Sequence, residues 1–110
     1  MKSLAVPLSV IMLVLGGCGE PSAESKAAMQ EIRMQRMARE FVSSGLKDPD
    51  SAEFRNQQGM CGEVNSKNSF GAFTGYQRFI AGNKDLVVLQ RDSRLKPEEF
   101  SQLWLKFCKD

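Results

Sequence analysis

The chain has 110 residues, a formal net charge of +2 and no histidine. This length allows a single small domain. The nearly balanced charge argues against a nucleic-acid-binding protein, which would carry a clustered excess of basic residues. Without histidine, the chain lacks the usual base of serine and cysteine nucleophiles and a principal zinc ligand.

The first seventeen residues have the composition of an export signal. Lys2 supplies the charged start, residues 4–15 are almost wholly apolar, and two glycines follow. The apolar run is far shorter than the roughly 20 residues that cross a bilayer as a helix, and it fits the central region of a secretory signal. The sequence therefore predicts export from the cytoplasm.

The motif Leu15-Gly16-Gly17-Cys18 resembles the lipobox of bacterial lipoproteins, in which an aliphatic residue and two small residues precede a cysteine. The resemblance implies that the Cys18 sulfur accepts diacylglycerol, and that cleavage before Cys18 makes it the first residue of the mature protein. Further acylation of the new amino terminus would make the anchoring stable, because two or more acyl chains hold a protein firmly on a membrane. We therefore expect a protein that is bound to membrane lipid through Cys18 in the cell envelope and faces the periplasm. Gly19 follows the cysteine in place of aspartate, which in enteric-type lipoproteins implies the outer membrane.

Residues 18–25 are polar and predict a short tether before a single domain over residues 26–110. Ser22 or Ser25 can cap the first helix, with Glu24 near its positive end. Six residues of this helix form an apolar stripe at helical spacing, namely Ala27, Met34, Met37, Ala38, Phe41 and Val42.

The opposite face of the predicted helix is mixed, because it carries Arg36 and Arg39 together with Met29 and Ile32. Such a face is either solvated or half covered, or it contacts a partner or the membrane surface. The helix is expected to stop at Gly45 in the left-handed conformation, with the next residue, a leucine, folding back onto it.

Beyond residue 51 the apolar pattern changes to that of extended chain. Strands are predicted over residues 52–57, 61–67, 76–81 and 86–89, with a long turn rich in glycine and asparagine between the second and the third. The fourth run is wholly apolar, which is typical of a strand that is covered on both faces and therefore central.

A last helix is predicted to begin at Pro97, which suits the first helical position and precedes two acidic residues. Its expected buried face comprises Phe100, Leu103, Trp104, Phe107 and Cys108. The order of the elements predicts an α+β domain with an N-terminal helix, an antiparallel sheet of three to four strands, and a C-terminal helix.

Two cysteines, Cys61 and Cys108, remain once Cys18 accepts lipid. An even pair in an exported protein favours a disulfide over two buried free thiols. A covalent link would also suit a domain whose core is small. Since the chain has neither histidine nor a Cys-x-x-Cys spacing, a zinc site lacks ligands.

No catalytic template is complete in this sequence. Glu98 and Glu99 lie about 100° apart on the predicted helix and do not converge on one bond, as the carboxylates of a glycosidase must. Ser66 and Lys67 are neighbours on a predicted strand and point to opposite faces, which disfavours a Ser–Lys dyad. There is also no phosphate-binding glycine loop. We expect a protein without catalysis, cofactor or metal.

The most distinctive stretch, residues 61–79, combines aromatic, amide and basic side chains around several glycines. Aromatic residues and arginine are common anchors of interfaces, and amides and lysine can add hydrogen bonds. Alternatively, the stretch is a hairpin whose asparagines and glycines satisfy turn geometry while its aromatic residues pack on the last helix. The candidate partner-binding residues are Asn65, Lys67, Asn68, Phe70, Phe73, Tyr76 and Arg78.

Residues 46–79, which include this stretch, resemble a family of small uncharacterised lipoproteins and exported proteins of bacteria and their prophages. The resemblance implies a shared fold and carries no activity. We expect a binding or protective module of the immunity, exclusion or inhibitor type, whose partner is an unknown envelope protein. The alternative is a structural accessory subunit of an envelope complex. A functional segment over residues 65–78 would favour the first role, and a functional Met29 and Ile32 face the second.

Overall fold

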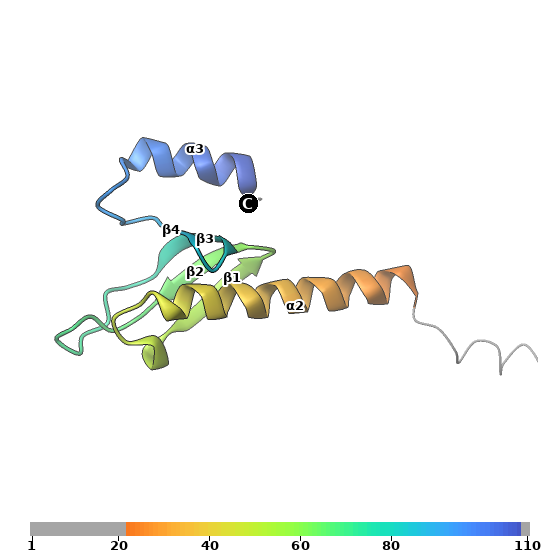
Figure 1. Cartoon of the computed structure of the whole chain (residues 1–110), viewed down its shortest axis with the longest axis horizontal. Helices are drawn as coiled ribbons and strands as arrows, with labels where there is room; N and C mark the ends of the chain where they lie inside the picture. The colour runs from red at the N-terminus through yellow and green to blue at the C-terminus, as the bar shows by residue number, and fades with distance from the viewer. Residues whose placement is uncertain (1–21, 109–110) are drawn as a thin grey trace, which may run out of the picture.

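Two helices enclose an antiparallel sheet in the computed structural model, which describes residues 22–108 (Figure 1). The strands follow each other in the sheet in the order β1-β2-β3-β4. The predicted α+β class, with a helix at each end of the domain and an antiparallel sheet between them, is confirmed. The elements in chain order are α2 (Ala23–Ser44), the 3-10 turn η2 (Pro49–Ser51), β1 (Glu53–Gln58), β2 (Cys61–Asn65), β3 (Gln77–Asn83), β4 (Leu86–Leu89) and α3 (Pro97–Phe107).

Helix α2 begins at the first of the two predicted caps and ends differently from the prediction. The hydroxyl of Ser22 accepts the backbone N–H of Ser25 at 3.1 Å, so the helix includes residues that the sequence assigned to the tether. At the other end Gly45 has a φ of −96°, which corrects the predicted left-handed conformation. The N–H groups of Gly45 and of Leu46 instead donate to carbonyls three residues back, and such tightened last turns need no glycine.

One face of the sheet packs against the C-terminal half of α2. Ala38 and Val42 of the helix are buried against Val64, Phe79 and Ala81 of the sheet. The fully buried Phe79 ring packs against the backbone of β2 at Gly62. Any larger residue there would clash, because its Cβ atom would lie 2.9 Å from the ring. The glycine therefore allows the core to close on this side.

The other face of the sheet packs against α3. Phe100 and Trp104 of the helix are buried with Cys61 and Ile80 of the sheet. Cys61 is joined by a disulfide to Cys108, which lies 47 positions later in the sequence, and their Cα atoms are 5.9 Å apart. The disulfide ties the start of β2 to the end of α3.

Strand β4 lies at an edge of the sheet, which corrects its predicted central place. Val87 and Leu89 contact the α2 side, and Val88 contacts the α3 side. Because a helix covers each face, even an edge strand is apolar on both sides. An unbroken apolar run therefore does not distinguish an edge strand from a central one in this fold.

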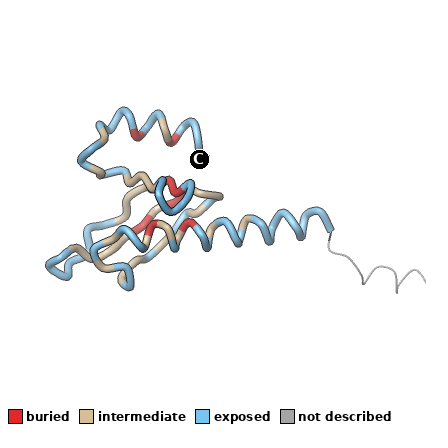
Figure 2. Tube along the Cα trace, viewed as in Figure 1, coloured by how far each residue is buried: buried red, intermediate tan, exposed pale blue. Residues whose placement is uncertain are grey.

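Both helices expose apolar residues that the periodicity had placed in the core. Met34 and Met37 are 45 % and 46 % exposed, Ala27 is exposed as well, and Phe107 of α3 is 51 % exposed. Helix α2 extends past the sheet, so its first two turns, which include Ala27, have no sheet beneath them (Figures 1 and 2). Met34 and Met37 line an open groove between the helix and the sheet. The predicted stripes are correct in spacing, but they are longer than the surfaces that cover them.

A row of polar side chains attaches α2 to β1. Both carboxylate oxygens of Glu31 accept the N–H of Gly59 at 2.9 Å, and Gln35 exchanges hydrogen bonds with Gln57. Arg39, which was expected on the outer face of the helix, donates to the Gln57 side chain at 2.9 Å. These contacts set the position of the helix along the strand.

Candidate functional site

The loop between β2 and β3, residues 66–76, forms the most exposed aromatic surface of the domain. It projects at the end opposite to the N-terminal end of α2 (Figure 1). Phe70 at its tip is 94 % exposed, and Phe73 is 49 % exposed. The alternative in which these aromatic side chains pack on the last helix is therefore wrong for both residues. We call this segment the β2–β3 loop.

The tip of the β2–β3 loop is held by its own hydrogen bonds. The side-chain oxygen of Asn68 accepts the N–H groups of Phe70 at 2.9 Å and of Ala72 at 3.2 Å. The backbone N–H of Asn68 donates to the Ala72 carbonyl at 2.9 Å, and Lys67 pairs with Phe73 in an isolated β-bridge. Asn68 therefore shapes the loop, and its oxygen is already used within it.

The base of the loop is held by residues from three other segments. The Asn65 side chain accepts the N–H of Gly75 at 3.0 Å, which fixes a glycine with a φ of +91°. Arg91 donates to the carbonyls of Thr74 and Gly75 at 3.1 and 2.9 Å, and Ser51 accepts the N–H of Lys67 at 2.8 Å. The loop is thus ordered, although it carries almost no regular secondary structure.

Sequence reasoning missed Arg91 and Ser51, because nothing local links either residue to the loop. Each lies more than a dozen positions away from the groups that it binds. An arginine after an apolar strand and a serine in a turn are ordinary surface residues, and only the folded chain brings them to the loop.

Tyr76 and Arg78 belong to the α3 side of the sheet. The Arg55 guanidinium lies 3.7 Å from the Tyr76 ring centre, and its Nε donates to Glu63 at 2.8 Å. Hydrogen bonds from Asn56 and Arg55 lower the pKa of the Glu63 carboxyl below its ordinary value. Arg78 stacks over Trp104 at 4.6 Å. In this region each aromatic ring is therefore covered by a guanidinium group, Tyr76 by Arg55 and Trp104 by Arg78.

The seven predicted partner-binding residues thus divide into three groups. Phe70, Phe73 and Lys67 form the tip, where the Lys67 ammonium lies 5.5 Å from the Phe73 ring centre. Asn65 and Asn68 form the frame of the loop, Tyr76 is its last residue, and Arg78 lies on β3. Of these three groups, the tip presents exposed apolar surface with a positive charge beside it, and it has the chemistry of a contact site.

A hollow of about 340 Å³ lies where the loop base meets the start of α3. Tyr76, Gln90, Arg91 and Phe100 contribute to its walls. Its place next to the loop would let it receive a side chain from a molecule that contacts the tip.

Comparison of the chain with protein-family models, curated proteins and solved structures gave no match. Within residues 22–108, no three potential metal-ligating side chains come together. None of the helices in the same part of the chain is both long and apolar enough to cross a membrane. Cys18 and the predicted export signal lie outside the described residues.

Proposed function

We propose that this protein is a non-catalytic lipoprotein of the cell envelope that binds a partner protein through the β2–β3 loop. The observation that carries the proposal is an almost fully exposed Phe70 on a loop whose backbone is hydrogen-bonded at its tip and its base. Burying one phenylalanine side chain contributes about 1.5–3 kcal/mol. Because the loop is already ordered, little of this gain would be lost in fixing its conformation.

The position of the loop suits a protein that is anchored at Cys18. Helix α2 has 22 residues and is therefore about 33 Å long, and the loop lies beyond its C-terminal end. An anchor just before α2 would hold the loop on the side that faces away from the membrane. That arrangement favours a protective module, of the immunity, exclusion or inhibitor type, that meets its partner in the periplasm.

The test is photo-cross-linking in intact cells, with a photoreactive amino acid at position 72 of the loop. Phe70→Ser should reduce the yield of the captured partner severalfold, and Lys67→Ala should reduce it less. The matched control is Leu105→Ser, because Leu105 is also an exposed apolar residue but lies on α3. All three changes should leave the free energy of unfolding within about 0.5 kcal/mol, as surface substitutions usually do.

Normal melting curves with unchanged capture by the Phe70→Ser variant would exclude the loop as the binding surface. The anchor is checked in the same cells, where Cys18→Ser should prevent acylation and cleavage of the precursor. A Ser variant that is still processed and still retained in the membrane fraction would refute the lipoprotein assignment.

The second candidate role is a structural accessory subunit of an envelope complex. The exposed Met29 and Ile32 on α2 favour it, because a larger partner could cover them. This role predicts protein capture from a photoreactive residue at position 32 that does not depend on Phe70.

A further inference from the structure

The end of the domain opposite the β2–β3 loop gathers exposed apolar side chains from separate elements. All of them lie between 45 % and 58 % exposed, which is unusual for so many large apolar residues at one end of a small protein. We call this the tether-end surface, and it comprises Met29, Ile32, Met34, Met37, Leu86 and Phe107.

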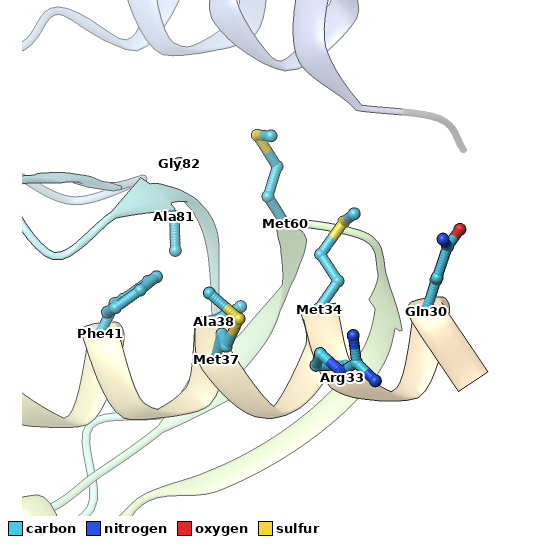
Figure 3. Close-up of a pocket in the computed structure, with 9 residues that line it drawn as sticks. All are labelled: Gln30, Arg33, Met34, Met37, Ala38, Phe41, Met60, Ala81 and Gly82. Carbon is cyan, nitrogen blue, oxygen red and sulfur yellow. The ribbon is translucent and has the colours of Figure 1, made fainter. Parts of the chain in front are cut away.

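Grooves connect most of these residues into one surface. A groove of about 360 Å³ runs between α2 and the sheet along Met34, Met37 and Met60 (Figure 3). At Met60 it adjoins a second groove of about 200 Å³, which is lined by apolar residues that include Leu86 and Phe107. Met60 extends from the β1–β2 turn into the space between α2 and α3 (Figure 3). The lining of these two grooves contains no acidic residue.

The first two turns of α2 have no support from the rest of the domain. Residues 22–30 are all exposed, and Glu31 makes the first of the hydrogen bonds that attach the helix to β1. A helical segment this short is marginal in water unless another surface packs against it. One side of α2 carries Lys26, Met29, Arg33 and Arg36 at spacings of three and four residues, with Ile32 beside them. Up to Arg36 this line combines apolar and basic side chains, and Glu40 follows one turn further along it.

The length of chain before α2 indicates what lies against this end. Cys18 precedes Ser22 by four positions, which span at most about 14 Å when fully extended. The headgroup layer on each side of a bilayer is itself roughly 5–8 Å thick. An acylated Cys18 would therefore keep the first turn of α2 beside the headgroups.

The charges of this end complement those of anionic phospholipids. Within residues 23–36 of α2, the β3–β4 turn and the last turn of α3, basic residues outnumber acidic ones, and Glu31 is already bonded to a backbone N–H. The basic residues are Lys26, Arg33, Arg36, Lys84 and Lys106, and the acidic ones are Glu24, Glu31 and Asp85. Apolar side chains flanked by basic ones are typical of helices that lie in a membrane interface.

We propose that the tether-end surface rests on the phospholipid bilayer, with its apolar side chains at the boundary between headgroups and acyl chains. The inference rests on the acylation of Cys18 in the proposed function, because the anchor keeps this end at the membrane. The contact would fix the orientation of the domain, with the β2–β3 loop turned towards the periplasm. Anchor and surface would thus act together to present the loop.

The test uses the full-length protein purified from membranes and reconstituted into vesicles of phosphatidylethanolamine and phosphatidylglycerol. A fraction of the lipid carries a diazirine in its acyl chain, and labelled peptides are identified by mass spectrometry after illumination. Peptides that contain the tether-end surface should carry at least fivefold more lipid adducts than the peptide that contains Phe70. Ile32→Glu combined with Leu86→Glu should lower labelling of the tether end severalfold, whereas Phe70→Glu, the matched control, should leave it unchanged.

The outcomes separate the inference from the proposed function. Acylated Cys18, seen in the intact mass, together with equal labelling of both ends would overturn the lipid-facing surface and leave the anchor standing. A mass without acyl chains would overturn the anchor and the surface together. An intact disulfide and a normal melting curve for the double variant show that lost labelling does not come from unfolding.

Discussion

The two ends of the domain both expose apolar side chains, but they display them on different kinds of backbone. At the loop end, Phe70 lies on an irregular segment whose backbone donates hydrogen bonds to Asn68 and accepts them from Arg91. At the tether end, methionines project from the regular surface of α2, and their own side chains have three rotatable bonds. One end therefore presents an aromatic side chain with few rotatable bonds on a hydrogen-bonded loop, and the other presents flexible side chains on a helix.

This difference indicates what each end is suited to contact. A rigid aromatic side chain loses little freedom when it enters a shaped pocket, so it suits a protein partner of defined structure. Flexible methionine side chains adapt to irregular or fluid surroundings, such as lipid.

Removal of the disulfide should have the largest effect, and it should act on the tether end. Cys61→Ala and Cys108→Ala should each lower the free energy of unfolding by about 2–5 kcal/mol. Their combination should cost little more than either alone, because both remove the same bond. Hydrogen exchange should increase along α3, whereas the β2–β3 loop, whose hydrogen bonds do not involve α3, should keep its protection. Two reactive thiols in the denatured, unreduced wild-type protein would rule out the pairing.

Asn68→Ala should have a smaller effect that is confined to the loop end. It removes the acceptor of two backbone N–H groups and should lower the free energy of unfolding by about 1 kcal/mol. It should also raise hydrogen exchange in the loop and lower partner capture. Asn83→Ala is the control, because Asn83 accepts one N–H in the β3–β4 turn. Equal loss of capture in both variants would show that the order of the loop is not what the partner requires.

The smallest effect should follow from Arg94→Gln. Arg94 holds the pKa of Asp92 at about 2 through side-chain and backbone hydrogen bonds, and carboxyl titration by NMR should show it rise towards its ordinary value in the variant. A depressed pKa stabilises the folded state above the ordinary carboxyl pKa, and this contribution disappears as the pH falls towards 2. Partner capture should not change, because Arg91, rather than Arg94, holds the loop. An unchanged Asp92 pKa in the variant would show that Arg94 is not its cause.

Local signals in the sequence were sufficient for much of the fold. Ser22 as a helix cap, Pro97 as the first residue of α3 and the apolar run of β4 each depend on neighbouring residues alone. These signals place the elements to within a few residues. The alternation of strands that are buried on both faces was harder to interpret, since Phe79 and Ile80 point to opposite helices and are both buried.

Apart from the Cys61–Cys108 disulfide, contacts between distant segments could not be predicted from the sequence. Arg39 was expected on the face of the helix opposite the apolar stripe, but its guanidinium bonds Gln57, which lies next to an irregularity in β1. The aromatic residues of the β2–β3 loop had the composition of either a core or a contact surface. The exposure of Phe70 depends on how Asn68 turns the chain and on where α3 comes to lie, and neither is encoded near the phenylalanine.

The disulfide also has a consequence for the order of events during export. A chain that enters the periplasm with its N-terminus first presents Cys61 to oxidants well before Cys108 arrives, since 47 positions separate them. In that interval Cys18 is the other cysteine that has already emerged, and a bond between it and Cys61 would trap the chain in a wrong pairing. Acylation converts the Cys18 sulfur into a thioether, which cannot form a disulfide. In our proposal, lipid attachment thus prevents a Cys18–Cys61 disulfide and keeps the Cys61 thiol free until Cys108 reaches the periplasm.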